Sequence, residues 1–119
     1  MSVKEVFLNG EYLPASEASI SIFDRGFTFG DGVYEVIPVY GGRLFRLQQH
    51  LDRLRYSLGE IRLLSPYADL EITRMLERLL ADINGDASIY LQITRGSAPR
   101  NHAFPGQVQP TVLAYAQDV

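Results

Sequence analysis

Two residues that could bind an anion stand close together in the segment TRGSAPRNHAFP, residues 94–105. Arg100 and His102 follow Pro99, and the two prolines of the segment restrict its backbone. A guanidinium offers a planar fork of donors that matches a carboxylate, and an imidazole adds a donor whose charge changes near neutral pH. The pair therefore suits a carboxylate. The alternative is that both are solvated residues of a surface loop.

A second set of cationic residues lies in the segment around QQHLDRLRYSL. His50 and Arg53 are three residues apart, and Arg46 precedes them by one further turn, so on a helix the three occupy overlapping sectors. Because arginine can give two hydrogen bonds to a phosphate, together they could bind one. The alternative is an exposed basic stripe that pairs with neighbouring Asp and Glu residues.

The third candidate is Tyr34 in the segment FGDGVYEV. On a strand, Tyr34 and Glu35 point to opposite faces, so only one of them can line a given pocket. We choose Tyr34, because its phenol could donate to a bound anion, although an aromatic residue at the start of a strand is commonly part of the core. The preceding Gly-Asp-Gly triplet is not a dinucleotide-binding fingerprint, since a strand follows it instead of a helix.

Other kinds of catalytic site find little support in the sequence. There is no cysteine, no Gly-x-Ser-x-Gly motif, and only two histidines, which are far apart, so neither a nucleophile with its base nor a metal cluster is expected. The only lysine, Lys4, lies beside Glu5 at the start of a predicted strand. A solvated amine in that position is a poor nucleophile, so we do not expect Lys4 to be catalytic.

Composition narrows the class of protein. The chain has 119 residues, of which 46% are hydrophobic and 21% charged, as expected for one globular domain. A net charge of −3 disfavours binding to nucleic acid. No apolar run is long enough to span a membrane, and the first residues lack the features of a signal peptide. We therefore expect a cytoplasmic protein with neither a nucleic-acid nor a membrane partner.

Turn residues and apolar patterns predict the first strands. The Asn-Gly pair at 9–10 predicts a β-hairpin, and the Gly-Gly pair at 41–42 predicts a second hairpin over residues 33–45. Between them, residues 20–32 contain three glycines and are predicted to form an ordered loop without regular structure.

The second half of the chain begins with a change of period. Apolar residues recur every three or four positions over 47–61, which predicts an amphipathic helix. Asp69 is the predicted N-cap of a second helix whose apolar side runs to Ile83. Residues 88–96 and 110–116 are rich in β-branched and aromatic residues, as in strands. The order of elements predicts an α+β fold: a two-layer domain in which two helices pack on one face of a largely antiparallel sheet.

Three motifs together resemble a known family. FDRGFTFGDGVYEV, HLDRL and YLQITRGSAPRNHAFP occur in the order and approximate spacing of the small N-terminal domain of the fold-type IV pyridoxal-phosphate enzymes. The chain is most similar to the D-amino-acid aminotransferase branch of that family, from about residue 7 to residue 115. This resemblance implies a pyridoxal 5'-phosphate cofactor and the transfer of an amino group between a D-amino acid, such as D-alanine, and a 2-oxo acid.

The resemblance also implies roles for individual residues. Arg53 matches the arginine that binds the cofactor phosphate, and Tyr34 matches a tyrosine of the substrate pocket, with Val36 near the same wall. Arg100 and His102 match a pair that reaches across a homodimer interface and binds the substrate α-carboxylate together with that tyrosine. The implied substrates are therefore a small amino acid and a 2-oxo acid.

The chain departs from the family in its length. Family enzymes have a larger C-terminal domain that carries the lysine that binds the cofactor, the acidic partner of the pyridine nitrogen and most other phosphate contacts. We therefore expect residues 1–119 to be the small N-terminal domain, without a catalytic residue and inactive alone. The alternatives are a branched-chain L-aminotransferase or aminodeoxychorismate lyase domain, or a non-catalytic module for anion binding or assembly.

Overall fold

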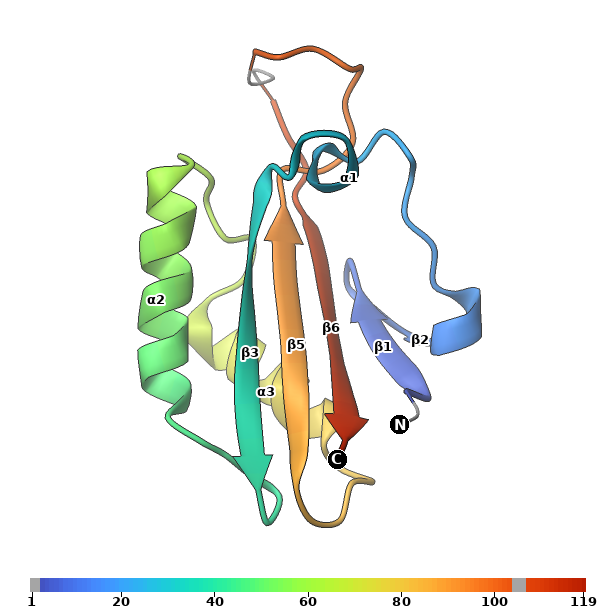
Figure 1. The fold of residues 1–119 in the computed structure, drawn as a ribbon, viewed down its shortest axis with the longest axis vertical. Coiled ribbons are helices and arrows are strands. Elements are labelled where there is room, and N and C mark those ends of the chain that lie inside the picture. The colour runs from blue at the N-terminus through green and yellow to red at the C-terminus, as the bar shows by residue number, and fades with distance from the viewer. Residues whose placement is uncertain (1–2, 104–106) are drawn as a thin grey trace.

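The protein is described here by a computed structural model, which covers residues 3–103 and 107–119. These residues form one six-stranded sheet with the order β2-β1-β6-β5-β3-β4, and each neighbouring pair is antiparallel (Figure 1). The strands are β1 (Glu5–Leu8), β2 (Glu11–Pro14), β3 (Gly32–Tyr40), β4 (Arg43–Leu44), β5 (Ala87–Thr94) and β6 (Thr111–Asp118). The helices are α1 (Arg25–Phe29), α2 (Leu47–Glu60) and α3 (Asp69–Leu79), with a 3-10 turn, η1 (Ala15–Glu17).

Both predicted hairpins are present. Asn9 and Gly10 have φ values of 50° and 94°, which a two-residue turn of this kind requires, and they join β1 to β2. The side chain of Asn9 also accepts a hydrogen bond from the backbone N–H of Val112, at 2.8 Å, so the turn is attached to β6. Gly41 and Gly42, with φ values of 57° and 79°, join β3 to the short β4.

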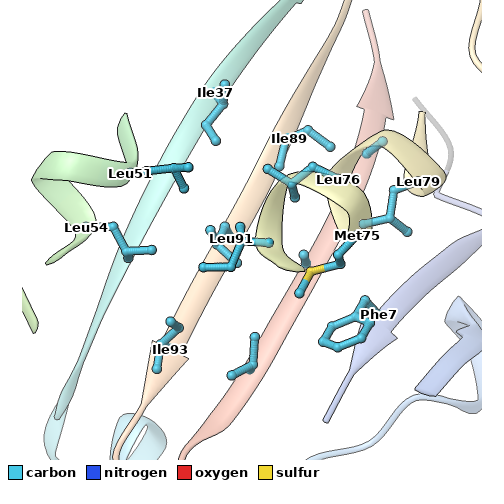
Figure 2. Close-up of a cluster of buried hydrophobic side chains, with 14 of the residues drawn as sticks. Phe7, Ile37, Leu51, Leu54, Met75, Leu76, Leu79, Ile89, Leu91 and Ile93 are labelled. Atoms are coloured by element: carbon cyan, nitrogen blue, oxygen red, sulfur yellow. The ribbon is translucent and has the colours of Figure 1, made fainter. Parts of the chain in front are cut away.

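The two long helices cover one face of the sheet, which confirms the predicted two-layer α+β fold. Helix α2 lies along β3, and α3 lies across β6 and β1 (Figure 1). Leu51 and Leu54 of α2 and Leu76 of α3 point into the core, where they meet the apolar residues of the central strands, such as Ile89 (Figure 2). Burying this face is the main stabilising contribution to such a domain.

The ends of α3 differ from the prediction. The N-cap is Ala68, and Asp69 is already the first helical residue. The Glu71 carboxylate accepts the N–H of Ala68 at 3.0 Å, so a side chain from the first turn satisfies the N–H of the N-cap residue. The helix ends at Leu79, before the predicted Ile83, because the chain then turns toward β5.

The prediction that residues 20–32 lack regular structure was wrong, because they contain α1. Asp24 caps this helix by accepting the N–H of Gly26 at 2.8 Å, and it is fully buried. Thr94 of β5 and Thr111 of β6 also donate to Asp24, at 2.7 and 2.6 Å. A Cβ on Gly26 would lie 2.3 Å from the Thr94 side chain. The glycine therefore permits close packing of α1 on the sheet.

Within residues 3–103 and 107–119, no helix combines the length and the apolar character that crossing a bilayer requires.

Candidate functional site

A buried carboxylate connects β3 to α2. Glu35 points to the helix-covered face of the sheet, and its side chain is 3% exposed. It lies 2.7 Å from Nδ1 of His50 and accepts two hydrogen bonds from Arg53, 2.9 Å from Nε and 2.8 Å from Nη2. His50 and Arg53 are one turn apart on α2, so one helix face directs both side chains to the same acceptor.

Glu35 is held in its charged form. Burial alone would raise the pKa of its carboxyl group, but the hydrogen bonds and charges of Arg53 and His50 outweigh burial and lower that pKa below its usual value. In turn, the hydrogen bond and charge of Glu35 raise the pKa of Arg53. The pair is therefore ionic over the whole physiological pH range.

Arg53 keeps donors for a further partner. Its bonds to Glu35 use Nε and Nη2, and the side chain remains 65% exposed. A guanidinium has five N–H donors, so those that point away from Glu35 can bind an anion such as a phosphate. The predicted third member of this group lies elsewhere, because Arg46 precedes α2 in a left-handed conformation and its guanidinium lies 5.3 Å from the ring of Phe45.

Tyr34 and Val36 lie on the opposite, open face of β3. They are 63% and 46% exposed, so Tyr34 is not part of the core. The Tyr34 ring stacks on Tyr90 of β5 at 5.8 Å, and Tyr90 stacks on Tyr115 of β6 at 5.4 Å. The predicted alternation of Tyr34 and Glu35 is confirmed, and a row of tyrosines crosses the open face.

The first part of β3 forms an edge of the sheet. Within residues 3–103 and 107–119, β4 pairs with β3 at Val39 and Tyr40, and the first part of β3 has no hydrogen-bonded strand on that side. Tyr34 and the acceptor of Arg53, Glu35, are adjacent residues of this part of β3, on opposite faces of the strand.

A cavity of about 320 Å³ adjoins the open face. Ile20, Ile22 and Phe27 line it on one side, and Gln92 and Leu113 line it on the other. Gln92 is the direct partner of Tyr34 in the sheet, so the cavity borders the tyrosine row. Its walls are largely apolar.

Arg100 and His102 meet at one aromatic ring. The Arg100 guanidinium lies 5.2 Å from the centre of the Phe29 ring, and the His102 ring lies 5.3 Å from it. Both side chains are exposed, so their polar groups can reach a ligand. The structure therefore brings this predicted pair together. Pro105, the second proline that we expect to restrict the backbone of this segment, lies outside the described residues.

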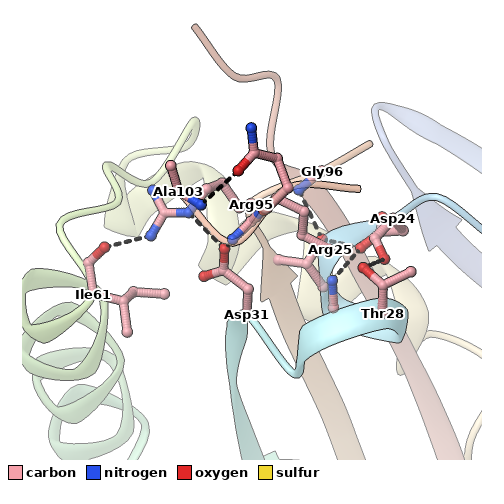
Figure 3. A network of polar contacts seen from close by, with 11 residues as sticks. Asp24, Arg25, Thr28, Asp31, Ile61, Arg95, Gly96 and Ala103 are labelled. Atoms are coloured by element: carbon pink, nitrogen blue, oxygen red, sulfur yellow. Dashed lines mark hydrogen bonds and ion pairs between the residues drawn. The ribbon is translucent and has the colours of Figure 1, made fainter. Parts of the chain in front are cut away.

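A second buried carboxylate, which we did not predict, lies beside this ring. Asp31 accepts hydrogen bonds from Nε of Arg25 at 2.7 Å and Nε of Arg95 at 2.8 Å, and both arginines are buried (Figure 3). Arg95 also donates to the backbone carbonyl of Ile61 (Figure 3). Burial alone would raise the pKa of Asp31, but the two arginines lower it below its usual value. Asp31 is thus ionised and joins α1, β5 and the end of α2.

Two of the predicted exclusions can be compared with the structure. Lys4 is exposed near the start of β1, as expected. Within residues 3–103 and 107–119, no group of three or more His, Asp or Glu side chains is arranged to bind a metal ion.

Comparison with known proteins identifies relatives of the chain. The family model described as "Amino-transferase class IV" matches residues 32–119. The D-alanine aminotransferase of Staphylococcus aureus (strain N315) is 45% identical over 118 residues, which cover 97% of this chain and 42% of that protein. The D-alanine aminotransferase of Bacillus licheniformis is 44% identical over 113 residues, with coverage of 93% and 40%.

Solved structures resemble the chain in fold. The branched-chain amino acid aminotransferase from Escherichia coli superimposes with a TM-score of 0.91 at 20% identity, covering 99% of this chain and 42% of that one. The 4-amino-4-deoxychorismate lyase from Pseudomonas aeruginosa superimposes with a TM-score of 0.75 at 28% identity, covering 95% and 39%. The chain thus spans about two fifths of the length of the relatives it matches.

Proposed function

The chain belongs to the class IV amino-transferase family, and from this we propose that the protein containing it transfers an amino group between a D-amino acid and a 2-oxo acid. The D-alanine aminotransferases at 44–45% identity support D-alanine as the amino donor. The branched-chain aminotransferase is only 20% identical, and a likeness at this level supports the fold alone. The observation that carries the proposal is the pair Arg100 and His102 on one ring with both side chains exposed, because this arrangement suits a carboxylate.

We propose that Arg53 binds the phosphate of pyridoxal phosphate. The donor set fits this group, because the guanidinium is anchored on one side by an ionised carboxylate and exposed on the other. A solved structure of similar fold, a branched-chain amino acid aminotransferase at 21% identity, is a complex with N-(5'-phosphopyridoxyl)-L-glutamate. When bound, the cofactor supplies the carbonyl group that takes up the amino group and the ring that accepts electrons. Glu35 then contributes by fixing the direction of the Arg53 fork.

We propose that Arg100 and His102 bind the α-carboxylate of the substrate, and that Tyr34 and Val36 form a wall of its pocket. A bidentate arginine with a neighbouring imidazole fixes the orientation of a carboxylate as well as its position. Orientation matters here, since the placed carboxylate determines which face of the α-carbon presents its hydrogen to a base. Stereospecificity would follow from this contact.

A homodimer and a cytoplasmic location stay predictions. We propose the homodimer from the resemblance of Arg100 and His102 to a pair that reaches across a dimer interface. Tyr34 and Val36 lie on the open face of β3, and Arg100 and His102 lie beside Phe29, on the segment that follows β5.

We further propose that residues 1–119 form the small domain of a two-domain enzyme. The share of each relative that the chain covers, about 40–42%, supports this division. The lysine that binds the cofactor would then lie in the second domain, because the only lysine of this chain is exposed at the start of β1. The chain alone would be inactive.

Amino-donor specificity tests the proposed function. The full-length protein containing this chain should transfer the amino group of D-alanine to a 2-oxo acid and should use L-leucine much more slowly. The reverse preference would favour the branched-chain L-aminotransferase. If pyridoxal phosphate bound and neither donor reacted, the proposed transfer of an amino group from these amino acids would be wrong.

A further inference from the structure

We infer that Arg25 and Phe29 are positioning residues for the pair Arg100 and His102, an inference that rests on the proposed carboxylate-binding role of the pair. Neither belongs to the predicted site. Both lie in α1, some seventy residues earlier in the chain, and the fold brings them under the segment that follows β5. Helix α1 therefore holds this exposed segment in one conformation.

Arg25 holds the backbone of the pair. Its Nη1 donates to the backbone carbonyl of Asn101 at 2.5 Å, and Asn101 is the single residue between Arg100 and His102. The Asn101 side chain accepts the N–H of Ala103 at 3.0 Å, which stabilises the local turn. A hydrogen bond to this carbonyl fixes the peptide between Asn101 and His102, which carries one predicted ligand and lies one residue from the other.

Phe29 supports the side chains of the pair. Arg100 and His102 both contact its ring, and Arg25 lies 4.6 Å from the centre of the same ring. Cations are attracted to the face of an aromatic ring, so the ring limits the directions that the Arg100 guanidinium takes. Phe29 is half-buried, and this keeps the ring itself in place.

Arg25 is rigid enough to perform this role. Its side chain is 3% exposed, its Nε donates to Asp31 at 2.7 Å, and its backbone N–H donates to the carbonyl of Gly96 at 2.8 Å. Asp31 in turn accepts from Arg95, which follows β5 directly. The contacts lead without a break from the end of β5 through Asp31 and Arg25 to the carbonyl of Asn101.

The consequence for binding is a lower entropic cost. Arginine on an exposed segment loses several rotatable bonds when it binds a ligand, and a contact that orders it beforehand reduces that loss. Removing the order should weaken carboxylate binding. Cofactor binding should not change, since Arg53 lies on α2 and is anchored separately by Glu35.

The first test measures the contact itself in the full-length protein. NMR of labelled histidine reports on His102, whose signal is identified by its loss in His102→Gln, and the signal lost in His50→Gln is the internal reference. In the Phe29→Leu variant, the ring-proton shifts of His102 should move toward those of free histidine, and those of His50 should stay. Phe29→Tyr keeps a ring and should restore the original His102 shifts. Unchanged His102 shifts in Phe29→Leu would overturn the inference.

The second test measures binding in the full-length protein. Phe29→Leu should raise the KM for D-alanine roughly fivefold, with kcat and the affinity for pyridoxal phosphate unchanged, and Phe29→Tyr should restore the KM. Arg25→Lys keeps the positive charge but loses the planar fork that joins Asp31 to Asn101, so it should also raise this KM. Phe45→Leu, the same substitution at a 43% exposed ring that a different arginine, Arg46, contacts at 5.3 Å, is the control and should leave the KM unchanged.

The outcomes separate this inference from the proposed function. If Arg100→Leu raises the KM and Phe29→Leu does not, the positioning role is wrong and the carboxylate role stands. If neither variant changes the KM, the proposed function is wrong as well. If Phe29→Leu lowers cofactor affinity and kcat together with raising KM, the residue has only a general structural role, which also overturns the inference.

Discussion

Changing Glu35 to glutamine tests the ionic contact that holds α2 to β3. The side chains are nearly equal in size, so packing is kept and the negative charge is lost. The carboxylate accepts from both nitrogens of the Arg53 fork and lies 2.7 Å from His50. An amide has one acceptor oxygen, so it cannot replace both oxygens of the carboxylate.

The magnitude follows from the burial of the partners. Glu35 is 3% exposed and His50 is 16% exposed, so this contact is largely shielded from water. A hydrogen bond to a charged group contributes about 1.5–3 kcal/mol, and the amide recovers part of this, so we expect Glu35→Gln to lower the free energy of unfolding by about 1–2 kcal/mol. The contact to Arg53 adds little to stability, because its guanidinium is 65% exposed and screened.

The effect should depend on pH in a defined direction. The folded protein lowers the pKa of Glu35, so the carboxylate stabilises the fold fully above its ordinary value of 4.5. As the pH falls below 4.5 and then passes through the lowered pKa, this contribution to stability is lost. Urea unfolding of the wild type and the variant should therefore show the full difference at pH 7 and a shrinking difference in acid.

Two results would refute this reasoning. Equal unfolding free energies at pH 7 would mean that the contact contributes nothing, and a difference that grows below pH 4.5 would have the wrong sign. Glu11→Gln, at an exposed position of β2, is the matched control and should leave stability unchanged at both pH values.

Three further changes test the rest of the fold by urea unfolding at pH 7. Asp31→Asn should destabilise by roughly 3–5 kcal/mol, because two buried arginines lose their counter-charge; a loss below about 1 kcal/mol would contradict an ionised Asp31. Leu76→Ala, at a fully buried position, should lower the free energy of unfolding by about 2–5 kcal/mol, whereas Leu64→Ala, at an 88% exposed position, should lower it little. Similar losses for the two variants would contradict the position of the core. Gly59→Ala should stabilise by about 0.5 kcal/mol, since Gly59 lies in the last turn of α2 and an added Cβ meets no atom within 4 Å; destabilisation would contradict a helical conformation at that position.

Local chemistry made most of the fold predictable. The Asn-Gly pair at 9–10 tolerates the positive φ of a tight turn, and the leucine period over 47–61 matches one face of α2, so both elements could be read from neighbouring residues. The N-cap of α3 was misplaced by one residue, because the choice between Ala68 and Asp69 depends on the reach of the Glu71 side chain.

Contacts between distant residues could not be predicted in the same way. Helix α1 is capped by Asp24, whose other partners, Thr94 and Thr111, follow about seventy and ninety residues later. Glycines that look like loop residues in the sequence are instead needed for close packing. No local pattern contains that information.

The candidate site shows the same division. Strand alternation predicts that Tyr34 and Glu35 lie on opposite faces, and this is confirmed, but alternation alone does not show that Glu35 binds the cations of α2. The helical spacing of His50 and Arg53 could have identified Glu35, because two cations on one helix face need a buried anion or a ligand. The sequence alone does not show which side of α2 faces β3.

The most direct test of the account is the KM of the full-length protein for D-alanine after Arg100→Leu. Loss of a charge-assisted, two-donor contact to the substrate carboxylate should raise this KM by roughly 30- to 100-fold, with pyridoxal phosphate affinity unchanged. A KM equal to that of the wild type would contradict the assignment of Arg100, and with it the proposal that this segment binds the acid group of an amino acid.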